Sequence, residues 1–197
     1  MKVFTSIGLM DIKEDCPDSL MAEFTLSQTK RVFHKLYAQL SDDLYHYLLS
    51  MSDEQTANDL AQKTWLKVYE QPHRYQAKTQ GNTSMRSGFK SWLFAIARNA
   101  LFDEFRRAKR ECEWLSEDCA LSPPAENELI SSSVHEAFDN ALMKLPLLQK
   151  EAFCLQQEGF SLAQISSITG SPAETIKTRL RYARDFLRVR LESFNEQ

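Results

Sequence analysis

Residues 161–190 constrain the fold more than any other part of the chain, because they combine two helical segments with a tight break between them. The first segment opens on S-x-x-Q at Ser161 and the second on S-x-x-E at Ser171, and both spacings are typical of a capping box. Gly170 lies where a helix end needs a residue that tolerates positive φ. Pro172 is expected at the first helical position, where its missing N–H costs nothing. The stretch therefore predicts a helix-turn-helix.

The second helix of this motif combines an apolar stripe with basic faces. The stripe consists of Ile176, Leu180, Ala183 and Leu187. The remaining faces carry Lys177, Thr178, Arg179, Arg181, Arg184, Arg188 and Arg190. Such a helix suits the DNA major groove, because its N-terminal side chains reach base edges while its charges meet phosphates. An ordinary helical hairpin with a solvated charged face is the alternative on this stretch alone.

Charge alternates along the chain, although the net charge is only −3. Residues 73–110 hold nine Lys and Arg against two Asp and Glu, whereas residues 111–140 hold eight acidic residues and no basic one. A polyanionic partner would bind the basic blocks and avoid the acidic spacer. At 43% hydrophobic residues the chain can also bury a core.

The pattern of residues gives no support to a helical enzyme. The four histidines are dispersed, no Ser/His/Asp group or phosphate-binding glycine loop occurs, and the four cysteines lack zinc-site spacing. We therefore expect no catalytic residue, no metal, no cofactor and no small-molecule substrate. No membrane-length apolar run or signal-peptide layout is present, which predicts a cytoplasmic protein.

The rest of the chain has helical rather than strand-like periodicity. Residues 1–24 show little periodicity and are expected to form a loosely ordered extension. From Thr25 an apolar period of 3.6 residues runs to Leu48. A further helix begins at Ser52 and stops at Pro72.

A polar, basic loop at 73–88 precedes a helix over 89–110. In that helix Phe94, Arg98 and Phe102 fall at i, i+4 and i+8, so that aromatic and cationic groups interleave. This combination suits bases unstacked from a duplex, because rings stack on bases and arginine pairs with phosphate. The competing interpretation is that both phenylalanines belong to the core.

Residues 111–132 are acidic and contain two consecutive prolines, which predicts a linker. We expect an all-α fold of two small helical domains, 25–110 and 133–197, behind the extension at 1–24. The two domains would be tethered by the acidic linker, with their relative orientation set by whichever partner is bound.

Four segments, taken in order, resemble the sigma-70 family of transcription factors. They read DLAQKTWLKVYE (59–70), SWLFAIARNALFDEFRR (91–107), LPLLQKEAFCL (145–155) and FSLAQISSITGSPAETIKTRLRYARDFLR (160–188). The chain is most similar to group IV, the extracytoplasmic-function type, which retains only the second and fourth conserved regions. The helix-turn-helix alone would be a weak signal, because many repressors carry one.

The resemblance implies a promoter-specificity subunit of RNA polymerase with no catalysis of its own. Region 2 would occupy 25–110 and region 4 would occupy 133–197. In the family the helix matching 59–70 docks on core polymerase, which here implicates Asp59, Gln62, Lys63 and Trp65. The following loop and helix melt the −10 element, which implicates Arg74, Lys78, Arg86, Lys90, Arg98, Asn99, Arg106 and Arg107. The last helix reads the −35 element, which implicates Ser171, Glu174, Thr175, Lys177, Thr178, Arg179 and Arg181. The implied partners are core RNA polymerase, promoter DNA and an anti-sigma protein.

Three features depart from the family pattern. Lys63 stands where an acidic residue is usual, and the loop at 73–88 is longer than usual. Glu174 stands where a small residue is common, and a carboxylate there would accept from cytosine but repel phosphate. The alternative function is a stand-alone helix-turn-helix DNA-binding regulator, which would leave the helix at 56–70 and the basic loop unexplained.

Overall fold

The computed structural model describes residues 16–75, 88–115 and 134–195, and within these ranges the chain is helical throughout, with no strand. The elements are α1 (Pro17–Ser27), α2 (Lys30–Met51), α3 (Glu54–Glu70), the 3-10 helix η1 (Pro72–Arg74), α4 (Gly88–Leu115), α5 (Val134–Met143), α6 (Leu147–Gln157), α7 (Leu162–Thr169) and α8 (Ala173–Asn195). The predicted all-α fold is confirmed.

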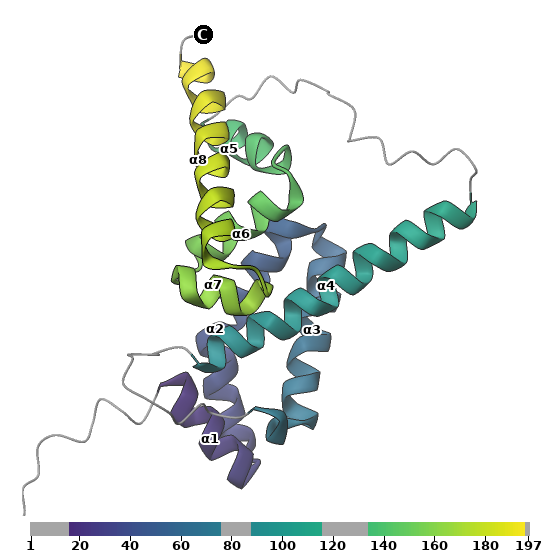
Figure 1. The fold of residues 1–197 in the computed structure, drawn as a ribbon. Helices are drawn as coiled ribbons and strands as arrows, with labels where there is room; N and C mark the ends of the chain where they lie inside the picture. The colour runs from purple at the N-terminus through teal and green to yellow at the C-terminus, as the bar shows by residue number, and fades with distance from the viewer. Residues whose placement is uncertain (1–15, 76–87, 116–133, 196–197) are drawn as a thin grey trace, which may run out of the picture.

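The N-terminal half is a bundle in which the long helix α4 crosses α2 and α3 (Figure 1). Its interior is filled by the apolar stripes that the 3.6-residue period predicts, among them Leu36, Leu44, Leu60 and Leu93, each at most 3% exposed. Burial of a leucine stabilises the fold by about 1.5–3 kcal/mol relative to leaving it in water. Packing of these apolar stripes therefore holds α4 against α2 and α3.

Helix α1 corrects the expectation that residues 1–24 form a loose extension. Residues 17–24 are helical and place Leu20, Met21 and Phe24 in the core, at 0–1% exposure. Thr25, predicted to start a helix, instead lies in the last turn of α1, where its Oγ1 donates to the Met21 carbonyl at 2.8 Å. The helix has only 11 residues, too short for its period to stand out from the sequence. Residues 1–15 lie outside the described ranges.

The C-terminal half consists of α5–α8, with α5 and α6 packed against α8 (Figure 1). The stripe predicted on α8 is confirmed, because Ile176, Leu180, Ala183 and Leu187 are at most 4% exposed. Gly170 ends α7 with φ of 67°, a left-handed conformation that favours glycine. The helix-turn-helix over α7 and α8 therefore forms as its local sequence predicts.

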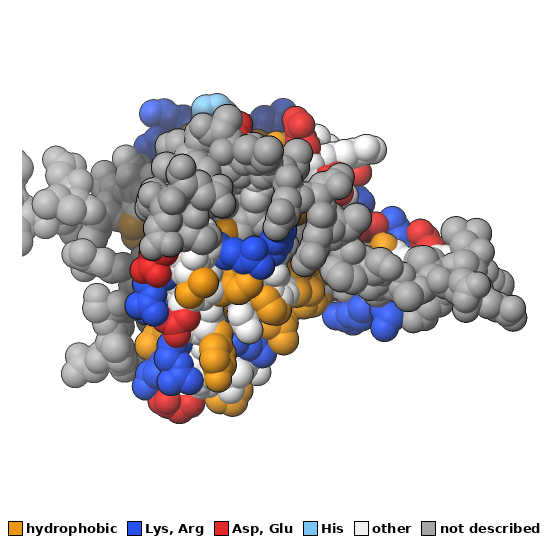
Figure 2. Space-filling model, turned by 90° about the horizontal axis from the view of Figure 1, so that it is seen from above, with side chains coloured by type: hydrophobic (Ala, Val, Ile, Leu, Met, Phe, Trp, Pro, Cys, Tyr) orange, Lys and Arg blue, Asp and Glu red, His pale blue; other side chains and the backbone are white. Residues whose placement is uncertain are grey.

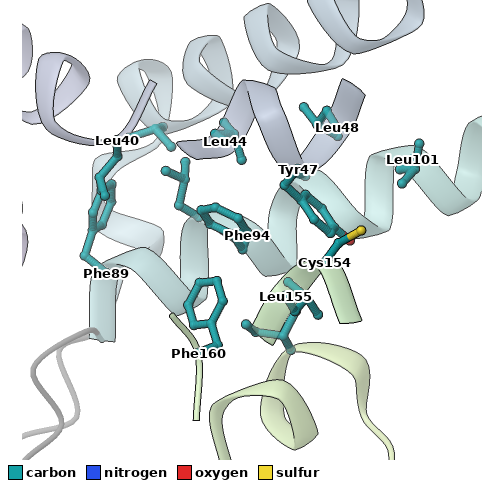
Figure 3. Packing of buried hydrophobic residues seen from close by; sticks show 14 of the residues in the cluster. Leu40, Leu44, Tyr47, Leu48, Phe89, Phe94, Leu101, Cys154, Leu155 and Phe160 are labelled. Atoms are coloured by element: carbon teal, nitrogen blue, oxygen red, sulfur yellow. The ribbon is translucent and has the colours of Figure 1, made fainter. Parts of the chain in front are cut away.

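The two halves pack directly on each other, which corrects the expectation that their relative orientation is free. Helix α7 lies against α4, and α6 lies against α2. Phe94 of α4 and Phe160, just before α7, are both buried with ring centroids 4.8 Å apart, and Tyr47 lies beside Cys154 (Figure 3). The reason is that α4 is apolar on two sides, so that one side covers the α2–α3 pair and the other covers the C-terminal half.

The boundary of the predicted linker also shifts. Helix α4 continues to Leu115, so that residues 111–115 of the expected linker 111–132 are helical. Residues 116–133 lie outside the described ranges, and the linker prediction for them stays a prediction.

Candidate functional site

The turn between α7 and α8 is held by side-chain hydrogen bonds. The capping box predicted at Ser161 is confirmed: Gln164 N–H donates to Ser161 Oγ at 3.4 Å and Ser161 N–H donates to Gln164 Oε1 at 2.8 Å. Ser166 Oγ donates to the Ser171 carbonyl at 2.6 Å, which closes the turn from within. These contacts fix the start of α8 relative to α7.

The second capping box, predicted from Ser171 and Glu174, does not form. Ser171 Oγ instead accepts from Arg179 Nη1 at 3.1 Å, and Glu174 Oε1 lies 2.6 Å from Lys177 Nζ. Helix α8 begins at Ala173, one residue later than expected. Both side chains are thus engaged with basic residues of α8 rather than with its first backbone N–H groups.

The residues predicted to read DNA lie on the first half of α8, apart from Ser171, which precedes the helix. Those that are exposed are Glu174, Lys177, Thr178 and Arg181, and those that are half-buried are Ser171, Thr175 and Arg179. The Glu174–Lys177 pair lies in solvent, where such a pair contributes little. The structure therefore brings these predicted side chains together at one end of the helix, open to a ligand.

Two of the cations predicted to bind the −10 element are engaged between the two halves of the molecule. Lys90 Nζ lies 2.6 Å from Asp43 Oδ2 and donates to the Glu158 carbonyl at 2.8 Å. Arg98 Nε lies 2.5 Å from Glu151 Oε1, and its guanidinium lies 4.3 Å from the Phe102 ring centroid. Neither cation is free for DNA in this arrangement.

The other predicted −10 residues on α4 are accessible. Asn99, Arg106 and Arg107 are exposed. The C-terminal end of α4 projects past the bundle (Figure 1). Arg106 pairs with Asp103 at 3.3 Å and Arg107 with Glu104 at 2.7 Å, both within one turn of α4. Arg74, at the end of η1, is also exposed. Lys78 and Arg86 lie outside the described residues.

Phe94 is not a stacking platform for bases. Its side chain is fully buried against Tyr47 and Phe160, as the core interpretation expected. Phe102 is half-buried beneath the Arg98 guanidinium. The alternation of aromatic and basic side chains on α4 therefore serves the packing of the two halves. The i, i+4 spacing alone did not distinguish this role from base stacking.

Glu151 is a buried acidic residue in the contact between the halves, and the sequence analysis did not single it out. Its carboxyl is buried, which raises its pKa, while the nearby charges of Arg98 and Arg179 lower it by a smaller amount. Burial, with the Glu151 charge second, also raises the pKa of the Tyr47 hydroxyl. A glutamate directly before the apolar residues AFCL, and shortly after the apolar LPLL, was the available signal.

The face of α3 predicted to dock on polymerase is only partly as expected. Asp59, Gln62 and Lys63 are exposed, but Trp65 is 5% exposed, so that its side chain belongs to the core rather than to the exposed face. Its indole packs against the Phe33 and Tyr37 rings, with centroids 5.9 and 5.0 Å away. Leu66, which is 55% exposed, lies one turn after Gln62, and the i, i+4 spacing places it on the same exposed face.

An apolar groove lies between the turn after α5 and the C-terminal half of α8. It is lined by Lys144, Pro146, Gln149, Tyr182, Asp185, Phe186, Val189 and Arg190. The end of the molecule seen in Figure 2 shows hydrophobic side chains next to Lys and Arg on its surface.

Two further properties concern the described residues alone. Among them, no three or more His, Cys, Asp and Glu side chains gather as a metal site requires. None of the helices in the described ranges has the length and apolar character to cross a membrane.

Two family models match the chain: Sigma-70 region 2 over residues 36–111, and Sigma-70, region 4 over residues 135–187. The ECF RNA polymerase sigma factor SigL of Mycobacterium tuberculosis is 30% identical over 164 residues, which cover 80% of this chain and 87% of SigL. The ECF RNA polymerase sigma factor SigM of Bacillus subtilis is 31% identical over 129 residues, covering 61% of this chain and 71% of SigM.

Solved structures share the fold. The sigma factor RpoE of Bartonella quintana, in complex with the anti-sigma factor NepR, matches with a TM-score of 0.64 and 27% identity. The match covers 81% of this chain and 96% of RpoE. CnrH, in complex with the cytosolic domain of CnrY, has the same TM-score at 21% identity, which shows the fold alone.

Proposed function

The chain belongs to the sigma-70 family, as an RNA polymerase sigma factor of the extracytoplasmic-function type, and we propose that α3, α4 and α8 divide its work. Helix α3 docks on core polymerase, α4 holds unpaired bases of the −10 element, and α8 reads the −35 element as duplex. The polymerase supplies the chemistry, and this chain supplies the choice of promoter.

The observation that carries this proposal is the helix-turn-helix with an open reading end. The α7–α8 turn is fixed by the Ser161 capping box and by Gly170, while Lys177 and Arg181 project into solvent. A rigid turn with exposed cations on the second helix is what a reader of the major groove needs. The cations supply phosphate contacts, and their neighbours on the same turn supply base contacts.

Binding of the −10 element requires the two halves to separate. Lys90 and Arg98 are held by groups on both sides of the contact, including the Glu158 carbonyl and the Glu151 carboxylate. DNA therefore competes for these cations with the closed arrangement, in which the two halves pack on each other. We propose that core polymerase resolves this competition by holding the two halves apart on its surface.

An anti-sigma protein is the third partner of the proposed function. The structure of RpoE was solved with its anti-sigma factor NepR. We propose that this chain is controlled by a protein of the same class. A stand-alone DNA-binding regulator remains the alternative, and it leaves the exposed face of α3 without a role.

The experiment combines co-purification with run-off transcription, using the full chain and core RNA polymerase. Wild-type protein should bind core polymerase and start RNA at defined sites, whereas the Asp59→Ala, Gln62→Ala double variant should lose both. Gln55→Ala, an exposed neutral change on the same helix, is the control and should retain both. Binding of DNA without any binding to core polymerase at low salt would favour the stand-alone regulator.

A further inference from the structure

Helix α1 is joined to the start of α4 by one carboxylate. Asp18, half-buried in the first turn of α1, accepts from the Phe89 backbone N–H at 2.8 Å. That N–H is one of the first four of α4, which have no acceptor within the helix. A negative charge there is also favoured by the helix dipole. Asp18 therefore caps α4 through Phe89, which lies 71 residues later in the chain.

The same carboxylate reaches the end of η1. The Tyr75 hydroxyl donates to the Asp18 oxygen that also binds Phe89. The Tyr75 ring lies edge-on to Phe89, with centroids 5.5 Å apart, and 5.4 Å from the Trp92 ring. Tyr75 and Gly88 are the described residues on either side of 76–87. This one oxygen ties Tyr75 to Phe89, the residue next to Gly88.

The contact lies directly against Gly88, which has no side chain to disturb it. A Cβ at position 88 would lie 2.8 Å from Asp18 Oδ1 and 2.9 Å from the Tyr75 hydroxyl oxygen. Both distances are shorter than ordinary Cβ contacts, so that a side chain at this position would shift the Asp18 carboxylate or the Tyr75 hydroxyl. Three elements thus meet at Asp18 with no room for a fourth group.

We propose that Asp18 is a positioning residue for promoter melting, which fixes the start of α4 to the end of η1 and so sets where Lys90 stands relative to Arg74. The proposal rests on the assignment of α4 to the −10 element. Asp18 itself contacts no DNA. It acts by holding two elements whose cations must reach the same strand.

The test uses holoenzyme assembled from the full chain and core polymerase. Wild-type holoenzyme first selects its promoter from a pool of duplex DNA randomised in the −10 and −35 regions. Three properties are then measured on the selected DNA: opening, by permanganate reactivity of unpaired thymines, base preference in the −10 element, and binding to the −35 duplex. Affinity for core polymerase and thermal unfolding by circular dichroism are measured in parallel.

Asp18→Ala should slow opening by roughly three- to thirtyfold, the range expected for a lost helix cap, and should relax −10 base preference. Core binding and −35 binding should change by less than about twofold, as expected for distant, independent sites. Tyr75→Phe removes one hydrogen bond but keeps the ring, and should show a smaller loss in the same direction. Glu23→Ala removes an exposed carboxylate from α1 and should change nothing.

Gly88→Ala supplies an independent variant from another element. Alanine raises helix propensity, so that a purely local effect would stabilise α4. If Gly88→Ala displaces Asp18, it should instead slow promoter opening as Asp18→Ala does. The Asp18→Ala, Gly88→Ala double variant should open the promoter no more slowly than either single variant.

Unchanged opening and base preference in folded Asp18→Ala would overturn the proposal. Equal loss of opening, core binding and −35 binding would also overturn it, because α1 would then serve only to hold the fold. If Asp18→Ala does not fold, Tyr75→Phe decides by the same criteria. A wild-type holoenzyme that opens no DNA from the pool would overturn the proposed function, and this proposal with it.

Discussion

Arg98 of α4 and Glu151 of α6 form an ion pair between the two halves of the molecule, with Arg98 Nε 2.5 Å from Glu151 Oε1. The side chains are 16% and 0% exposed, and 53 residues separate them in the chain. Arg98 is also one of the residues assigned to the −10 element. In the proposed function, the pair therefore links DNA binding to the packing of the two halves.

Replacement of Glu151 by alanine should open the molecule. Loss of one partner leaves the Arg98 charge without an acceptor, and breaking a buried pair in this way costs about 3–5 kcal/mol. We expect the free protein to show a larger radius of gyration in small-angle X-ray scattering and to bind DNA more tightly. Glu192→Ala, an exposed change on α8, is the control and should leave both unchanged. An unchanged radius for Glu151→Ala would contradict the role of the pair.

Cys154 should report this opening chemically. It is 5% exposed in the contact between the halves, and burial raises its pKa to about 11. Since the thiolate is the reactive form, it should alkylate at pH 8 roughly a hundredfold more slowly than an exposed thiol. Cys16, which is exposed, supplies the comparison in a Cys112→Ser, Cys119→Ser background. Equal rates for Cys154 and Cys16 would show that the halves are apart in solution, whereas Glu151→Ala should accelerate Cys154 alone.

The closed arrangement should weaken as pH rises. Burial holds the pKa of Glu151 above its ordinary value of 4.5, so that the closed form takes up a proton more readily than the open form. The stability that Glu151 adds to the closed form is therefore fully present below pH 4.5 and is lost as pH rises through the raised pKa. Burial also raises the pKa of Glu158 above its ordinary value. The radius of gyration should increase across this interval, and Glu151→Gln, which stays neutral and keeps an acceptor for Arg98, should flatten the change.

Trp65 and Leu66 should separate folding from docking on α3. Trp65 is 5% exposed within an aromatic cluster, so that Trp65→Ala should lower the free energy of unfolding by about 3–5 kcal/mol in urea titration. Leu66 is 55% exposed, and Leu66→Ala should change stability by less than about 0.5 kcal/mol. Affinity for core polymerase should nevertheless fall in Leu66→Ala. Normal polymerase binding by that variant would remove Leu66 from the docking face.

Lys177 and Arg181 should each contribute one phosphate contact. Alanine at either position should reduce the slope of log K against log salt for −35 duplex binding by about 0.9. Glu174→Ala should raise DNA affinity, because it removes an exposed carboxylate beside Lys177. Lys144→Ala, an exposed charge change on the turn after α5, should not alter the slope. Unchanged slopes for both α8 variants would place this helix away from DNA.

Local features were predictable wherever neighbouring residues decide them. The Ser161 capping box, the left-handed Gly170 and the buried stripe of α8 each depend on residues within a few positions of one another. The second capping box did not form because a residue outside its four positions competes for the serine hydroxyl. Arg179, two turns along α8, takes the Ser171 hydroxyl as its acceptor, and the S-x-x-E spacing carries no information about that competitor.

The sequence by itself determined that this chain folds into helices with a helix-turn-helix near its end, because periodicity and caps are written into adjacent residues. Tertiary structure alone decided which neighbour covers each apolar face. A period of 3.6 residues reports that α4 has apolar sides, but not that Phe94 meets Phe160 or that Arg98 meets Glu151. It likewise left α1 unrecognised, because a helix of 11 residues is stabilised mainly by the helices on which it packs.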